Sequence, residues 1–264
     1  MTQLGIAPLA AAASSEPLLR VASLSRNYGG VKAVVDVSFD VPPRGITGLI
    51  GPNGAGKSTV VGIIAGDVQQ TTGSVVFGGL DISGFASYRR AEAGLIRTFQ
   101  MSGEFRKLTV LENLIAAVPS AGESVSGVLV RGSRWRSDLA ATVARAVAML
   151  ERFDMTGKAD TWAGELSGGQ KRLVEIMRGL MANPRLLLLD EPMAGVNHHL
   201  RSRIETHLLE LRDEGIPMLM IEHELSVVER CCDRVIVMAR GLKLAEGTMA
   251  DHRANEEVRR AYLA

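Results

Sequence analysis

One short stretch of the chain has the residue types and the spacing that phosphate binding needs. It matches the pattern G-x-x-x-x-G-K-[ST] at every fixed position and reads Gly51-Pro52-Asn53-Gly54-Ala55-Gly56-Lys57-Ser58-Thr59. Glycines let backbone N–H groups turn toward phosphate oxygens, and a following helix adds the partial positive charge of its N-terminus. We expect Lys57 to reach the β- and γ-phosphates of a nucleotide and Ser58 to ligate Mg²⁺.

Two acids follow an apolar run further along the chain. Leu186 to Leu189 precede Asp190 and Glu191. In a protein with a phosphate loop, the first carboxylate binds Mg²⁺ directly or through water, and the second can act as a general base on the attacking water. Adjacent residues on a strand point to opposite faces, so the two acids can meet the phosphates from different directions. The alternative is an ordinary pair of solvated acids at a strand end.

Two further polar residues close apolar segments. His223 stands between two acids after the run 218–221, where it can contact a phosphate or orient Glu191. Gln100 ends the segment 96–99, from which it can reach Mg²⁺ or the attacking water. Either residue alone would be read as structural or solvated, because a lone His or Gln is a weak signal.

A second anion-binding element lies outside the phosphate loop. The sequence Leu166-Ser167-Gly168-Gly169-Gln170 precedes a helical pattern with Ser167 as its predicted N-cap. The apolar face of this helix comprises Leu173, Ile176, Met177, Leu180 and Met181. Its N-terminus favours an anion. One nucleotide cannot easily use both elements of one chain, so we expect Ser167 to Gln170 to close on a nucleotide held by another subunit.

The elements that must position these residues indicate an α/β protein. Short apolar strands between helices predict a parallel sheet covered on both faces. The predicted strands are 45–50, 72–79, 185–189, 218–221 and 235–238, and two earlier ones carry Val21, Leu24, Tyr28, Val35, Val37 and Phe39. The earlier pair predicts an antiparallel part. Helical spacing dominates from 88 to 163, with one face at Val110, Leu111, Leu114 and Ile115 and another at Leu139, Val143, Ala146, Val147 and Leu150.

Composition excludes several classes of function. The 264 residues carry a net charge of +1, from 30 basic and 29 acidic residues, and only 4% are aromatic, which argues against a nucleic-acid partner. No apolar run approaches the ~20 residues that span a bilayer. Cys231 and Cys232 are adjacent, which predicts reduced, structural thiols. The Gly/Ser-containing connection 120–137 holds Arg131, Arg134, Trp135 and Arg136, which we interpret as a solvated basic patch, with contact to a partner or a lipid headgroup as the alternative.

Taken in order, these motifs resemble those of the ATP-binding subunits of ABC transporters. The resemblance covers about Leu19 to Ala264 and joins residues 51–59 (Walker A), Gln100 (Q-loop), 166–170 (signature), 186–191 (Walker B) and His223 (H-loop). It implies a P-loop NTPase core with a mixed parallel sheet, an antiparallel β subdomain and a helical insertion. It also implies ATP and Mg²⁺ as ligands, with Tyr28 stacked on adenine and Ser167, Gly168, Gly169 and Gln170 acting in trans.

Finer features are similar to the ATPase subunits of branched-chain amino-acid importers. They include 96–100, 108–113, 191–197, 221–223 and the ending 260–263. His198 and Glu224 stand where that group usually has Pro and Asp, and its signature often differs at Gly168. Urea and short-amide importers and the ATPase of lipopolysaccharide export share several of these features, so they remain alternatives.

The resemblance further implies a domain plan and a set of partners. We expect a disordered lead at 1–18, one ATP-binding domain at 19–264 with its core at 19–87 and 180–250, a helical subdomain at 88–179 and a final helix at 255–264. The expected partners are integral-membrane permeases, a second ATPase subunit and, indirectly, a solute-binding protein, at the cytoplasmic face of the membrane. Rival interpretations are a soluble ABC ATPase acting on nucleic acid or ribosomes, and a small-molecule kinase in which 166–170 would have no role.

Overall fold

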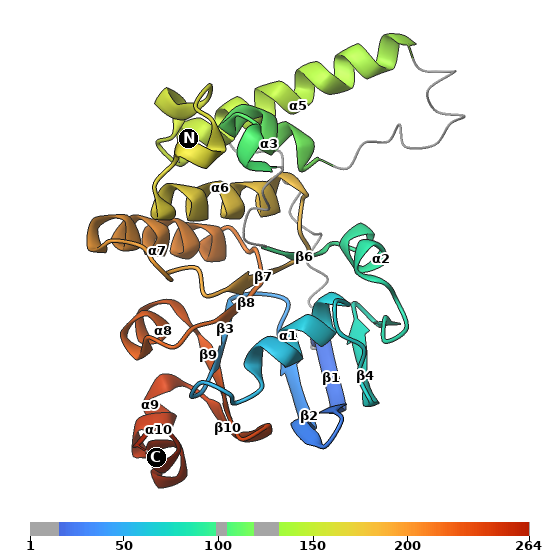
Figure 1. Ribbon diagram of the computed structural model, residues 1–264, viewed down its shortest axis with the longest axis vertical. Helices are drawn as coiled ribbons and strands as arrows, with labels where there is room; N and C mark the ends of the chain where they lie inside the picture. Colours follow the sequence, from blue (N-terminus) through green and yellow to red (C-terminus); the bar gives the residue numbers. More distant parts are fainter. Residues whose placement is uncertain (1–15, 99–104, 119–131, 264) are drawn as a thin grey trace. The chain divides into compact units, whose positions relative to one another are not determined.

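The computed structural model describes residues 16–98, 105–118 and 132–263, and it divides into two compact units (Figure 1). The core unit contains the described residues up to Arg97, residues 185–194, and residues from Ser202 onward. The helical unit contains residues 98–184 and 195–201. The predicted lead at 1–18 lies almost wholly outside the described residues, as does Gln100.

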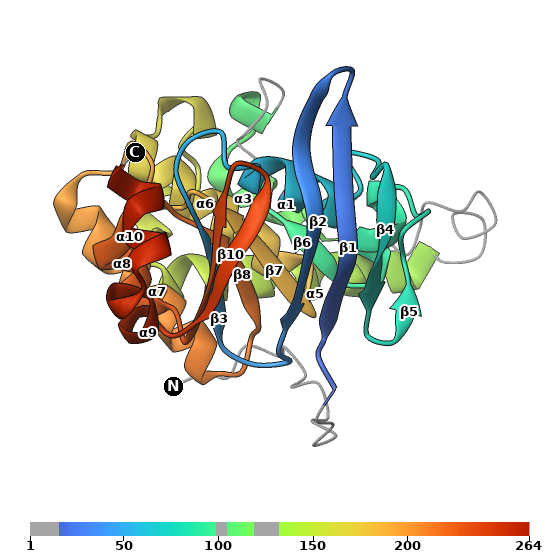
Figure 2. The same cartoon turned by 90° about the horizontal axis from the view of Figure 1, so that it is seen from below.

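The core unit contains two sheets. The larger is ordered β10-β9-β3-β8-β7-β6, with β9, β3, β8, β7 and β6 all parallel and β10 antiparallel to β9. Its strands are β3 (Ile46–Ile50), β6 (Leu95–Arg97), β7 (Leu186–Asp190), β8 (Met218–Ile221), β9 (Arg234–Ala239) and β10 (Leu242–Gly247). The smaller, antiparallel sheet is ordered β2-β1-β4-β5 (Figure 2). It comprises β1 (Leu19–Tyr28), β2 (Val31–Val41), β4 (Thr72–Phe77) and β5 (Leu80–Asp81).

Helix α1 (Lys57–Ala65) joins the two sheets into one hydrophobic core. Its residues Val60, Val61, Ile63 and Ile64 are buried in a single cluster with Leu24, Val37 and Val75 from the smaller sheet and Leu49, Leu188 and Ile221 from the larger. The helix ends at Gly66, whose φ of 86° is the left-handed conformation that favours glycine. This confirms the predicted sequence of strand, glycine loop and helix.

The C-terminal end of α1 is held by a buried arginine. Arg90, on α2 (Ser87–Glu92), is 2% exposed and donates to the carbonyl oxygens of Ile63 at 2.6 Å and Ile64 at 2.8 Å. It also donates to the carbonyl oxygens of Ser83 and Phe85. The last carbonyl groups of a helix have no hydrogen-bond donor within the helix. The Arg90 guanidinium supplies such donors to the end of α1.

The first hairpin does not alternate regularly between buried and exposed residues. Val34 and Val37 are fully buried while Val35 is only half-buried, because Asp36 has a φ of 49° and interrupts the pleat. Ser23, on β1, has a φ of 48°, and the pairing of the two strands shifts register in this region. Val35, Val37 and Phe39 all lie on β2 as predicted, but a bulge moves the inward position by one residue, so Val34 rather than Val35 is buried with Val37.

The helical unit contains α3 (Val110–Ala116), α5 (Gly132–Arg152), α6 (Gly168–Met181) and the short 3-10 turns η1 (Phe105–Lys107), η2 (Thr156–Lys158) and η3 (Ala163–Glu165). The predicted apolar face of α6 is confirmed, since all five residues are buried. On α5 the buried residues are Ala146, Met149 and Leu150, whereas Leu139 and Val147 are exposed. The connection 120–137 is also shorter than predicted, because α5 begins at Gly132.

The remaining helices follow the later strands of the chain. Helix α7 (His198–Asp213) begins in the helical unit and ends in the core unit. The core unit also contains α8 (Leu225–Cys231), α9 (Met249–Ala254) and α10 (Glu256–Leu263). The helix predicted at 255–264 corresponds to α10, while β10 and α9 were not anticipated. In the described ranges, no helix combines the length and the apolar character that crossing a membrane requires.

Candidate functional site

The predicted chemical groups of the core unit gather at one edge of the larger sheet. The phosphate loop follows β3, His223 follows β8, and Asp190 and Glu191 end β7, and these three strands are parallel neighbours in the order β3, β8, β7. The carboxyl ends of parallel strands meet at one edge, which is where α/β folds place their ligands. The parallel neighbour β6 ends at Arg97, three residues before Gln100, which lies outside the described residues.

The phosphate loop has a backbone that only glycine permits at two points. Gly51 has a φ of 151° and Gly56 a φ of 97°. A Cβ at Gly51 would lie 2.1 Å from the carbonyl oxygen of Met238, and one at Gly56 would lie 2.5 Å from that of Ala33. The loop is therefore pressed against β9 and β2, which fixes the path of its N–H groups.

The Lys57 ammonium lies inside the curve of this loop. Lys57 is 6% exposed, and its Nζ donates to the carbonyl oxygens of Gly51 at 2.7 Å and Pro52 at 2.9 Å. Burial lowers the pKa of Lys57, and the negative charges of Glu191 and then Asp190 oppose that shift. An ammonium has three donors, so one donor remains for a phosphate oxygen.

Asp190 shares a cation with a second carboxylate. Arg97 donates from Nη2 to Asp190 Oδ2 at 2.6 Å and from Nη1 to Asp67 Oδ2 at 2.7 Å. The side chain of Arg97 is 16% exposed, that of Asp190 is 26% exposed and that of Asp67 is 30% exposed. Arg97 thus fixes the orientation of Asp190, and any divalent cation that bound this carboxylate would have to compete with Arg97.

Glu191 has an unusual backbone. Its φ of 47° lies in the left-handed region, which costs a non-glycine residue about 1 kcal/mol or more. Its N–H donates to the Ile221 carbonyl oxygen at 3.1 Å. The side-chain directions of Asp190 and Glu191 are therefore set by this turn, whereas the sequence-based argument relied on strand alternation. Such outliers are frequent at functional sites.

Two predicted binding residues lie on exposed surface of the core unit. The His223 side chain is 58% exposed, and its Nδ1 lies 3.8 Å from Glu222 Oε2. Tyr28, at the end of β1, is 45% exposed. The Arg26 guanidinium carbon lies 4.5 Å from the centre of the Tyr28 ring, a cation–π contact that covers part of this aromatic residue.

The second anion-binding element begins α6 in the helical unit. Ser167 Oγ accepts from the Gln170 N–H at 3.3 Å, and Gln170 Oε1 accepts from the Ser167 N–H at 3.0 Å, which confirms Ser167 as the N-cap. Ser167 and Gly168 are exposed, while Gly169 is buried. A Cβ at Gly169 would lie 2.2 Å from Leu200 Cδ2, so glycine allows α6 to pack closely against the start of α7.

The residues at the sheet edge fit a Mg²⁺–nucleotide better than an isolated metal ion. Among the described residues, no three His, Cys, Asp or Glu side chains form a group that could hold a metal. Ser58 is exposed at the loop and Asp190 is partly exposed, and Mg²⁺ is usually held by one or two such groups together with phosphate oxygens. The curved glycine loop, buried ammonium and partly exposed carboxylate are what this ligand requires.

Sequence reasoning missed the contacts that several arginines and one acid make. Arg97 and Glu222 were noticed only as neighbours of Gln100 and His223. Arg90 and Arg26 were not singled out. A charged residue beside a predicted apolar strand or motif is the sequence signal that could have identified these residues. Such a residue needs a hydrogen-bonding or oppositely charged partner when the segment is buried.

Three comparisons relate the chain to known proteins. A model of the family described as "ABC transporter" matches residues 34–194. The branched-chain amino acid transport ATP-binding protein LivG of Escherichia coli K12 is 37% identical over 252 residues, which cover 94% of this chain and 98% of LivG. A probable LivG of Archaeoglobus fulgidus is also 37% identical, over 93% of this chain and 95% of its own length.

Solved structures agree with these sequence matches. A nucleotide-free ATP-binding cassette from an ABC transporter has a TM-score of 0.82 at 36% identity, covering 94% of this chain and all of that cassette. The ADP conformation of an ATP-binding cassette of an ABC transporter has a TM-score of 0.81 at 35% identity, covering 95% of this chain. The predicted α/β P-loop fold is thereby confirmed.

Proposed function

The chain belongs to the ABC transporter family, and on that premise we propose that it is the ATP-hydrolysing subunit of an importer of branched-chain amino acids. The observation that carries the proposal is the shared sheet edge, where the phosphate loop, Asp190, Glu191 and His223 follow three neighbouring parallel strands. The names of the relatives support the amino-acid class of the solute.

In the proposed mechanism, the loop N–H groups and Lys57 bind the β- and γ-phosphates of ATP. Ser58 and Asp190 would hold Mg²⁺, which neutralises charge on the phosphate oxygens. Glu191 accepts a proton from the water that attacks the γ-phosphorus, and the bond to the β-phosphate oxygen breaks. His223 would contact the γ-phosphate from the neighbouring strand end, Gln100 would contact the metal or the water, and Tyr28 would stack on adenine.

We further propose that two such subunits, identical or different, act together. Ser167 to Gln170 of each subunit would contact the γ-phosphate of the ATP bound to the other. Closure then depends on an intact γ-phosphate, because the added contacts exist only in the closed state. The subunits would sit at the cytoplasmic face of the membrane on permease subunits, which receive solute from a binding protein.

A Glu191→Gln variant tests the catalytic proposal. It keeps the size of the side chain but loses the base, so hydrolysis should fall by at least 100-fold while ATP binding persists. With ATP and Mg²⁺ it should elute as a dimer in size-exclusion chromatography. Wild-type hydrolysis by Glu191→Gln would refute the assignment of the base.

The solute is tested in proteoliposomes that contain the chain, its permeases and its partner ATPase subunit, supplied with the solute-binding protein. ATP-dependent uptake of labelled leucine, isoleucine or valine is expected, and the Glu191→Gln complex serves as the inactive control. Uptake of urea or short amides in place of these amino acids would overturn the solute assignment and leave the ATPase assignment intact.

A further inference from the structure

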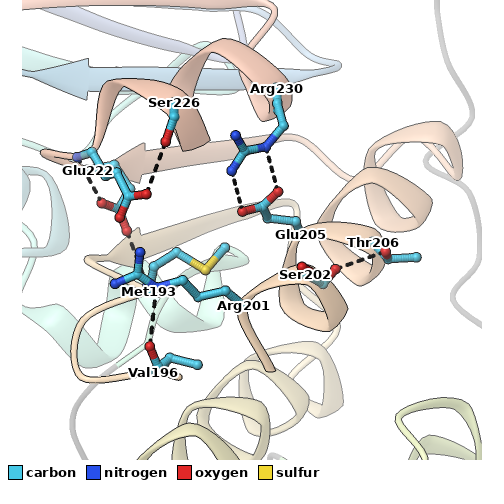
Figure 3. A network of polar contacts seen from close by, with 10 residues as sticks. Met193, Val196, Arg201, Ser202, Glu205, Thr206, Glu222, Ser226 and Arg230 are labelled. Carbon is cyan, nitrogen blue, oxygen red and sulfur yellow. Dashed lines mark hydrogen bonds and ion pairs between the residues drawn. The ribbon is translucent and has the colours of Figure 1, made fainter. Parts of the chain in front are cut away.

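A buried carboxylate connects the two loops that carry Glu191 and His223. Glu222 is completely buried. Its Oε1 accepts from the Met193 N–H at 3.1 Å, and its Oε2 accepts from the His223 N–H at 3.0 Å. Glu222 and Met193 belong to the polar network drawn in Figure 3. A longer contact of 3.5 Å joins Oε2 to the Glu224 N–H. A charge this deeply buried is retained only where such donors stabilise it.

The two bonded N–H groups belong to different loops. Met193 lies in the turn after β7, which is closed by a bond from the Ala194 N–H to the Glu191 carbonyl oxygen at 3.0 Å. His223 lies in the loop after β8. The hydrogen bond from the Glu191 N–H to the Ile221 carbonyl oxygen is the last backbone bond between β7 and β8. One residue after Ile221, the Glu222 side chain joins the two loops through its bond from the Met193 N–H.

This arrangement fixes a conformation that would not persist alone. Glu191 has a left-handed backbone, which a non-glycine residue adopts only where the surrounding structure imposes it. Glu222 holds the turn on the C-terminal side of Glu191, and the strand pairing of Asp190 with Ile221 holds the other side. The same carboxylate fixes the main chain of His223.

We propose that Glu222 is a positioning residue for ATP hydrolysis, which sets the location of Glu191 relative to His223 without contacting the nucleotide. The inference rests on the proposed function, because it takes Glu191 and His223 to act at the γ-phosphate. A displacement of about 1 Å at a reacting group can reduce a rate about 100-fold, so one carboxylate can control turnover from outside the reacting groups.

The test compares Glu222→Gln with Glu229→Gln. The first variant keeps the shape of the side chain but points an amide NH₂ at one of the N–H donors, so one loop loses its bond. The second makes the same substitution in a partly exposed residue on α8, paired with Arg253. Glu222→Gln should lower kcat about 10- to 100-fold with KM for ATP within about twofold, since the phosphate loop on β3 is untouched. Glu229→Gln should match the wild type.

Amide hydrogen exchange supplies a readout that is independent of activity. In Glu222→Gln, the segments 191–195 and 222–226 should lose protection, while the phosphate loop should not. Glu222→Asp keeps the charge with a shorter reach, so its loss of kcat should be smaller. Unchanged kcat in Glu222→Gln, or a general loss of protection together with ATP affinity, would overturn the positioning role. If Glu191→Gln retained full activity, the assignment of Glu191 as the base would fail, while the exchange result would still report whether Glu222 holds the loops.

Discussion

Replacing the buried Arg90 with Met should destabilise the protein through the carbonyl groups at the end of α1. The substitution keeps an apolar stem of similar length and removes the guanidinium. Ile64 O then loses a hydrogen bond of 2.8 Å, while Ile63 O loses one of 2.6 Å but keeps a bond from the Gly66 N–H at 3.1 Å. The bonds to Ser83 and Phe85 lie in partly buried positions, where water can replace them more easily.

The magnitude follows from these losses. An unsatisfied buried acceptor costs about 1–3 kcal/mol, so Ile64 O contributes about 2 kcal/mol and the half-satisfied Ile63 O about 1 kcal/mol. Burial lowers the pKa of Arg90, so its charge is held at a desolvation cost that the variant recovers. We therefore expect a net loss of about 2–3 kcal/mol, and a fall in Tm of about 4–12 °C.

Urea unfolding and calorimetry measure this loss against Arg89→Met as a matched control. Arg89 is exposed, and its guanidinium carbon lies 5.9 Å from the centre of the Phe85 ring. Removing this guanidinium should therefore cost less than about 1 kcal/mol. Arg90→Lys keeps a charge but cannot reach four carbonyl groups, and it should fall between the two. The reasoning is refuted if Arg90→Met unfolds at the same urea concentration as Arg89→Met.

Three further outcomes are expected. Gly56→Ala should lower the affinity for a fluorescent ATP analogue more than about tenfold, because the added Cβ would lie 2.5 Å from a main-chain carbonyl oxygen. Gly54→Ala is the control, since Gly54 also has a positive φ but its Cβ would have no atom within 4 Å, and its effect should be much smaller. If Asp190 holds Mg²⁺ as proposed, Arg97→Leu should lower the Mg²⁺ concentration needed for half-maximal nucleotide binding, because it removes the cation that would compete for Asp190. A higher Mg²⁺ requirement would contradict this. Burial raises the pKa of the Cys231 thiol from 9.0 to about 11, so the thiol loses its proton at a lower pH in the unfolded chain than in the folded protein. The free energy of unfolding should therefore fall as pH rises from 9.0 toward 11, and Cys231→Ala should show a weaker fall.

The parts of the fold that follow local rules were predictable from sequence. The phosphate loop needs glycine for its backbone and a helix immediately after it, so its pattern specified strand, turn and α1 together. The α6 face followed from 3.6-residue spacing, and Ser167 followed from capping chemistry. In each case the information lies within a few neighbouring residues, where the chain itself restricts the geometry.

The missed features depend on contacts between distant segments. Arg97 and Asp190 are separated by 93 positions and Met193 and Glu222 by 29, so no local pattern pairs them. The bulge at Asp36 changes which valines face inward, although the composition of the strand is unchanged. On α5, Val147 fits the apolar period but is exposed, because tertiary packing rather than periodicity decides how much of a helix face is covered.

The left-handed backbone of Glu191 sets stability and activity against each other at a single position. Glycine at 191 would relieve the strain, and the protein would gain up to about 1 kcal/mol while losing the carboxylate that we propose as the base of the reaction. A library of variants selected only for thermal resistance should therefore enrich Gly or Asn at this position. Selection for transport should restore Glu. The most heat-resistant proteins from such a library would be the ones that no longer turn over.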